Sequence, residues 1–156
     1  MGNLRTDKRF RRIQRAFRYG CDRFGMRMVE FSVQGNHIHL IVEAKNQSAL
    51  SRGMQGLAIR LAKGINRLSN RKGQIFVDRY HARILRTPTE VRNAVRYVLH
   101  NQKKHVRKAG RAMDERYLDP YSSMSGEALW YVDKYGSSMV VAAPRTWSLR
   151  SAAGFL

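Results

Sequence analysis

"SVQGNHIHLIVEA", residues 32–44, places two histidines one residue apart inside an otherwise apolar run. The turn-forming residues "QGN" at 34–36 precede this run, and the strand-like segment "MRMVEFSV" at 26–33 precedes the turn. Two strand-like segments joined by three turn residues predict a β-hairpin. The rest of the fold can be worked out from this hairpin outward.

The two histidines of this segment are candidate metal ligands. Side chains alternate between the faces of a strand, so His37 and His39 are expected on one face, about 6.6 Å apart at their Cα atoms. At that separation two imidazoles can converge on one ion. An ordinary strand with one buried face and one wet, polar face gives the same pattern, so a metal site also needs a third ligand.

Helical periodicity flanks the predicted hairpin. Apolar residues recur at spacings of three and four over about residues 7–24 and again over 48–69, which predicts one helix in each range. Residues 75–85, "IFVDRYHARIL", alternate loosely and favour a strand, bent or interrupted around Asp78. Helices and strands in this order predict an α+β fold in which helices pack on an antiparallel sheet.

"TPTE", residues 87–90, is a helix start signal with Thr as N-cap, Pro at the first position and Glu closing a capping box. The helix is expected to continue to Gly110. Tyr97 and Asn101 lie one turn apart on it, on the face opposite its apolar residues. A tyrosine beside a divalent ion is a plausible nucleophile, and an amide oxygen is a hard ligand. A helix whose exposed face merely carries these two side chains is the plainer alternative.

Charge indicates the class of partner. The chain has 156 residues, with 30 Lys and Arg against 11 Asp and Glu, a net charge of +19 and a pI near 11.2. Phosphates neutralise such an excess, so a nucleic acid is the expected partner. The single cysteine, Cys21, excludes an internal disulfide. No apolar run approaches a membrane span and no signal core is evident, so we expect a cytoplasmic protein.

The chain is expected to form one domain over residues 1–110, followed by a tail over residues 111–156. The tail is rich in Ser, Gly and Tyr, and it has no clean period. We expect it either to dock on the domain through Trp130, Tyr131 and Trp147 or to be partly disordered.

These motifs together resemble a known family. "QGNHIHLIV" is similar to "MPNHVHLLV", and "YVLHNQ" to "YIHLNP", of the REP-associated tyrosine transposases, which are IS200-like, single-tyrosine HUH transposases. "ALSRGMQGL" and "GQIFVDRYHAR" support the likeness, which extends over about residues 10–110. It implies the ferredoxin-like or RRM-like HUH fold. The family's first strand precedes its first helix, and here it either lies outside the sequence or is replaced by another segment.

The resemblance also implies an activity. His37, His39 and Asn101 would bind Mg²⁺ or Mn²⁺, and Tyr97 would attack single-stranded or hairpin DNA. The products would be a 5′-phosphotyrosine and a 3′-hydroxyl, as DNA transposition by a bacterial, DNA-associated monomer or homodimer requires. A non-catalytic nucleic-acid binder of the same fold is the first alternative, and a ribosome-associated RNA-binding protein is the second.

Arginines near the predicted site are candidate phosphate ligands. The candidates lie on the predicted strand and on the helix that follows it: Arg79, Arg83, Arg86, Arg92 and Arg96. A solvated basic face explains any one of them equally well. Tyr80 and His81 could stack a base or be ordinary strand residues.

Overall fold

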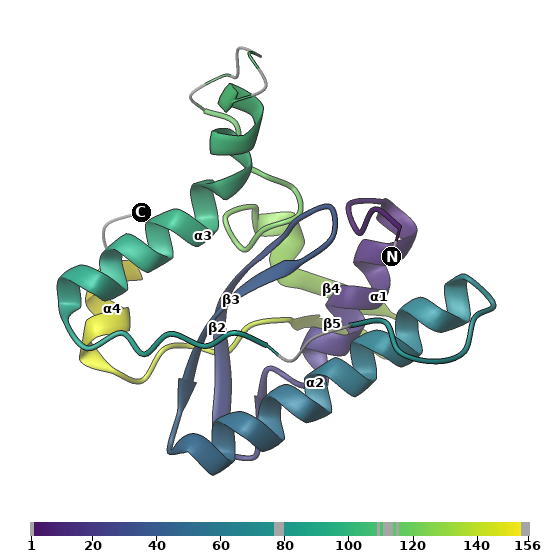
Figure 1. Cartoon of the computed structure of the whole chain (residues 1–156), viewed down its shortest axis with the longest axis horizontal. Coiled ribbons are helices and arrows are strands. Elements are labelled where there is room, and N and C mark those ends of the chain that lie inside the picture. Colours follow the sequence, from purple (N-terminus) through teal and green to yellow (C-terminus); the bar gives the residue numbers. More distant parts are fainter. Residues whose placement is uncertain (1, 77–79, 109, 111–113, 115, 154–156) are drawn as a thin grey trace.

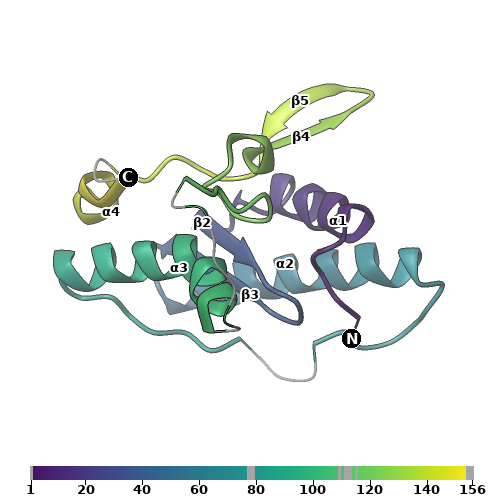
Figure 2. The ribbon, with the colours of Figure 1, turned by 90° about the horizontal axis from the view of Figure 1, so that it is seen from above.

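The computed structural model describes residues 2–76, 80–108, 110, 114 and 116–153. The predicted hairpin is present: β2 (Met26–Val33) and β3 (Ile38–Ala44) pair antiparallel. Helices cover both faces of this sheet (Figures 1 and 2). The predicted α+β fold, with helices packed on an antiparallel sheet, is therefore confirmed.

The first helix is shorter than predicted. α1 spans Asp7–Arg18, and the chain then enters β1 (Asp22–Arg23), which pairs with the start of β2. Phe24 and Gly25 form the connecting turn with φ angles of 58° and 77°, as in a type I′ hairpin turn. The end predicted at residue 24 was wrong because pairing with β2 outweighs the helical spacing of the apolar residues there.

One extra residue in β2 decides which side chains reach which core. Met28 pairs with Val42 and Glu30 with Ile41, so Val29 is a β-bulge. The bulge reverses the alternation along β2 beyond it. Residues on both sides of the bulge, Met28 and Phe31 among them, therefore point into the same core, while Val29 points to the opposite face.

The larger core lies between the sheet and helices α1 and α2. α2 spans Gln47–Leu68, within one residue of the prediction, and the Asn46 side chain caps it by accepting the Ala49 N–H at 2.8 Å. Ile38, Leu40 and Val42 of β3 pack against this core. Its buried members on the helices and on β2 include Ile13, Phe17, Met28, Phe31, Leu57, Leu61 and Ile65.

α3 (Pro88–Lys108) covers the other face of the sheet. The predicted capping box is present: Thr87 Oγ1 accepts the Glu90 N–H, and Glu90 accepts the Thr87 N–H, each at 3.2 Å. α4 (Trp147–Ala153) packs on α3 (Figure 1). The apolar residues of this second core are Val29, Ile41, Val91, Val95, Val98, Leu99, Leu149 and Ala152.

Residues late in the chain cover the edge of β2 that β3 leaves open. The Val33 N–H donates to the Tyr121 carbonyl at 2.9 Å, and the Ser123 N–H donates to the Phe31 carbonyl at 3.0 Å. Ser32 and Ser122 form an antiparallel bridge between these two contacts. A segment from beyond residue 110 thus lies where a further strand would pair.

The late segment is anchored mainly by polar contacts and small apolar side chains. It contains a 3₁₀ turn (Gly126–Leu129), the β4–β5 hairpin (Trp130–Asp133 and Gly136–Met139) and α4. The prediction that Trp130 and Trp147 dock it was wrong, because their side chains are 48% and 66% exposed. Tyr131 does pack against the larger core. The buried apolar anchors are Ala128, Val140, Ala142, Leu149 and Ala152.

The strand predicted over residues 75–85 was also wrong where the structure describes it. Residues 75–76 and 80–85 contain no strand, and residues 77–79, with Asp78 and Arg79, lie outside the described part of the chain. Ile84 is 76% exposed, whereas Ile75 and Phe76 pack partly buried against the larger core and Leu85 against the second core, so the apolar side chains of this stretch do not share one buried face. β-propensity produces a strand only where a partner strand and a buried face are present. None of the helices in the described ranges is long and apolar enough to cross a membrane.

Candidate active site

The two histidines face each other at the start of β3. His37 lies directly before the strand and His39 within it, and their Nε2 atoms are 3.1 Å apart. The ring centroids are 4.7 Å apart, with the rings nearly perpendicular at 84°. The predicted placement of both side chains on one face is confirmed, since the residues that alternate with them pack into the opposite core.

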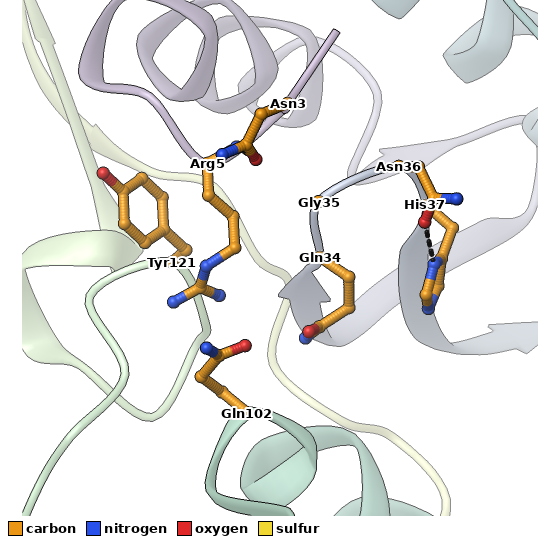
Figure 3. A pocket seen from close by; sticks show the side chains of 8 residues that line it. All are labelled: Asn3, Arg5, Gln34, Gly35, Asn36, His37, Gln102 and Tyr121. Carbon is orange, nitrogen blue, oxygen red and sulfur yellow. Dashed lines mark hydrogen bonds between the residues drawn. The ribbon is translucent and has the colours of Figure 1, made fainter. Parts of the chain in front are cut away.

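Asn36 orients the first histidine. His37 Nδ1 lies 2.8 Å from Asn36 Oδ1, as the dashed line in Figure 3 shows. An amide oxygen can only accept, so this contact requires the proton on Nδ1, and in the neutral ring Nε2 then has a lone pair available for a metal. Metal-binding histidines commonly have their second nitrogen fixed in this way.

The geometry of the histidine pair fits a divalent cation. Two imidazole nitrogens at about 2.1 Å from one ion and at a right angle would be about 3.0 Å apart. The observed 3.1 Å agrees with that value. In the described part of the chain no cluster of three or more His, Cys, Asp or Glu could hold a metal, so a third ligand must be of another type.

Asn101 is the residue whose chemistry suits that third position. It lies on α3, is only 2% exposed, and its Nδ2 atom has no hydrogen-bond partner within the described residues. Its burial contradicts the prediction that Asn101 shares the exposed face of the helix with Tyr97. The unpaired Nδ2 is a hydrogen-bond donor, so only the amide oxygen could bind a cation. Two imidazoles and one amide oxygen are donor types that suit a divalent ion.

Tyr97 lies against the histidine pair. Its ring centroid is 5.5 Å from that of His39, with the two rings at 77°. The tyrosine is 49% exposed, so a large substrate can reach it without any rearrangement of the core. α3 thus contributes both an exposed phenol and, one turn later, a buried amide.

The surroundings of Tyr97 are positively charged. Arg92 and Arg96 are exposed on α3, and Arg96 is the neighbour of Tyr97 in sequence. Burial lowers the pKa of His100, and the positive charges of Lys103 and Arg96 lower it further. A polyanion close to this part of α3 would be attracted from solution.

The other arginines predicted to bind phosphates precede α3 in the sequence. Arg83 forms an exposed ion pair with Glu90 at 3.3 Å, and the Arg86 backbone N–H donates to Glu90 at 2.8 Å. Both residues precede α3 in a segment without a helix or strand, not on the predicted strand. Arg79 lies outside the described residues. Tyr80 is 42% exposed, and His81 is exposed as well.

An open pocket of about 480 Å³ adjoins His37, and the sequence did not predict it. Of its lining, His37 was predicted as a site residue, and residues 34–36 were predicted only as the turn before it. The other residues come from separate segments, so no local pattern could have identified them. Figure 3 shows the lining: Asn3, Arg5, Gln34, Gly35, Asn36, His37, Gln102 and Tyr121.

Comparison with known proteins gives one finding. Residues 3–102 match the family model described as "Transposase IS200 like". The matched range contains the histidine pair, Tyr97 and Asn101, and it ends before the late segment that covers β2. No curated protein and no solved structure matches the chain.

Proposed function

The chain belongs to the IS200-like transposase family, so DNA is its partner, and we propose that it cleaves and rejoins single-stranded DNA through a covalent link to Tyr97. One observation carries this proposal: the Tyr97 ring packs 5.5 Å from His39, whose Nε2 lies 3.1 Å from that of His37. A nucleophile beside two nitrogens that could bind a metal ion supports metal-assisted phosphoryl transfer to a side chain.

In the proposed reaction Tyr97 Oη forms a bond to phosphorus while the bond from phosphorus to the 3′-oxygen breaks. The phenol loses its proton, and the departing 3′-oxygen gains one. The products are a 5′-phosphotyrosine and a 3′-hydroxyl. Because one phosphodiester replaces another, the step is reversible and needs no ATP, so two such steps with exchanged strands move a DNA segment.

Other residues of the chain would bind the metal ion and the DNA phosphates. Mg²⁺ or Mn²⁺ bound by His37, His39 and Asn101 would supply neutralisation of charge on the phosphate. Arg92 and Arg96 would bind phosphates beside Tyr97, and Arg79, Arg83 and Arg86 would bind phosphates along the approach to it. The exposed positions of the described arginines support this role.

The direct test is the covalent intermediate. The full-length protein is incubated with Mn²⁺ and a labelled hairpin-bearing single strand, selected for binding from a random library, and SDS-resistant adducts are measured. We expect an adduct in the wild type, none with Tyr97→Phe, and at least about a hundredfold less with His39→Ala, since loss of a metal ligand removes charge stabilisation.

Tyr135→Phe is the matched control, because Tyr135 is 77% exposed and lies on the late hairpin, away from α3. It should form as much adduct as the wild type. An adduct that survives Tyr97→Phe would exclude this nucleophile. Tight binding without an adduct under any divalent metal would instead identify a non-catalytic DNA-binding member of the family.

A further inference from the structure

We propose that the pocket beside His37 binds one nucleobase, that of the nucleotide on the 5′ side of the scissile phosphate. The proposal rests on the function proposed above and adds a base-binding subsite to it. The pocket volume of about 480 Å³ lies in the range of small-molecule sites. Three observations support a base rather than a phosphate at this position, and a fourth assigns the base to one side of the cleaved bond.

The first observation is that the charge of the pocket is already balanced. Arg5 makes two hydrogen bonds to Asp119, at 2.7 and 2.9 Å, and a third to the Val33 carbonyl at 2.8 Å. Asp119 is 2% exposed, so this carboxylate permanently neutralises the guanidinium. A phosphate in the pocket would have no unpaired positive charge to bind, whereas a neutral base needs none.

The second observation concerns the amides of the lining, which present donors and acceptors as base edges do. Gln34 is 3% exposed, and its Nε2 donates to Ser32 Oγ at 2.7 Å, which fixes the amide and leaves its oxygen for a ligand. Gln102 makes none of the hydrogen bonds found among the described residues. Figure 3 shows Arg5, Gln34 and Gln102 pointing toward one another.

The third observation is a rigid plane for stacking. The Arg5 guanidinium lies 4.6 Å from the centre of the Tyr121 ring, and the Tyr121 hydroxyl donates to Asp7 at 3.1 Å. Burial and the bond to Asp7 raise the pKa of Tyr121, so the hydroxyl keeps its proton. Unstacked bases stack on arginine planes, and a plane that is already fixed loses little entropy on binding.

The fourth observation assigns the base to one side of the cleaved bond. Tyr97 packs on His39, His39 packs on His37, and His37 lines the pocket. The nucleophile and the pocket therefore contact different members of the histidine pair. In an in-line displacement the attacking and leaving oxygens are on opposite sides of phosphorus. The leaving 3′-oxygen belongs to the nucleotide on the 5′ side, which is thereby directed to the pocket.

The test separates binding from chemistry. The Tyr97→Phe protein, without metal, is titrated with the selected single strand in which each nucleotide in turn is made abasic, and affinity is measured by fluorescence anisotropy. One abasic position is expected to weaken binding about tenfold, as loss of one stacked base does. In the same scan, a protein that also carries Gln102→Ala should lose most of that sensitivity. Gln55 is an exposed glutamine on α2, so a protein that carries Gln55→Ala instead should keep it.

The wild-type protein with Mn²⁺ then maps the cleaved phosphate on the same strand. The sensitive position should be immediately 5′ of it. Sensitivity on the 3′ side, equal sensitivity with Gln102→Ala, or no sensitive position at all would each overturn the proposal. If the wild type forms no adduct, the proposed reaction and the 5′ assignment fail, while the abasic scan still decides whether the pocket binds a base.

Discussion

The two faces of β3 differ in what their side chains contact. On one face Ile38, Leu40 and Val42 pack into the core formed with α1 and α2. On the other face only Ile41 is buried, and the two histidines stay accessible beneath α3. Neighbouring residues along β3 thus alternate between the core and the candidate site. Substitutions on the first face should change folding, and those on the second should change metal and DNA binding.

The largest effect is expected on the face of the sheet that packs against α1 and α2, to which β2 also contributes. Phe31 is fully buried, and its ring lies 4.9 Å from that of Phe17, so Phe31→Ala should lower the free energy of unfolding by about 3–5 kcal/mol. Urea unfolding followed by circular dichroism measures it. Ile59→Ala removes a side chain that is 47% exposed on α2 and should cost under about 1 kcal/mol. Equal losses of unfolding free energy in the two variants would mean that the sheet face toward α1 and α2 does not form the main core.

On the second face the expected effect is on metal-linked stability. A ligand that binds only the folded state at a hundred times its Kd adds about 2.7 kcal/mol to the free energy of unfolding. Mn²⁺ should produce this gain in the wild type and not in the His37→Ala, His39→Ala double variant. Urea unfolding with and without Mn²⁺ measures the difference. The same gain in both proteins would place the ion elsewhere.

A smaller effect on the same face is expected from Asn36. Asn36→Ala removes the acceptor that orients His37, so Mn²⁺ affinity measured by titration calorimetry should fall about tenfold without a change of fold. Asn36→Asp keeps an acceptor oxygen and should bind Mn²⁺ more tightly than Asn36→Ala. If alanine and aspartate behave alike, the hydrogen bond to His37 has no role in metal binding.

The smallest effect concerns the contact that joins the start of α4 to β3. Glu43 accepts hydrogen bonds from the Thr146 hydroxyl at 2.6 Å and from the backbone N–H groups of Thr146 and Arg145 at 2.7 and 2.9 Å. Burial raises the pKa of Glu43, but these hydrogen bonds outweigh it and hold the pKa below its ordinary value of 4.5. Glu43→Gln should cost about 1 kcal/mol at pH 7, as loss of a helix cap does.

The sign of the pH effect follows from that lowered pKa. Stability from ionised Glu43 is fully present above about pH 4.5 and is lost as the pH falls through the folded-state pKa. The wild type and Glu43→Gln should therefore converge in acid, which urea unfolding at several pH values measures. Glu127→Gln, at an exposed position, should follow the wild type throughout. A constant difference between wild type and Glu43→Gln would contradict the proposed contact.

Local patterns predicted the parts of the fold that local physics controls. The hairpin around 34–36 was predicted from turn residues between two strand-like runs, and the start of α3 from Thr87 and Glu90, which do form the capping box. The end of α1 and the strand at 75–85 were mispredicted, because each depends on whether a partner strand is nearby. Periodicity contains no information about partners far away in the chain.

The sequence by itself determined the two-faced strand, the nucleophile and ligand candidates, and the positive charge, since alternation, helical spacing and composition are read directly from residue order. Only the tertiary structure decided that His39 contacts Tyr97, that residues 121–123 cover the edge of β2, and that Arg5, Gln34 and Gln102 enclose one pocket. These contacts join residues 29 to 97 positions apart. Their formation depends on packing of the whole chain, because no local preference brings such distant residues together.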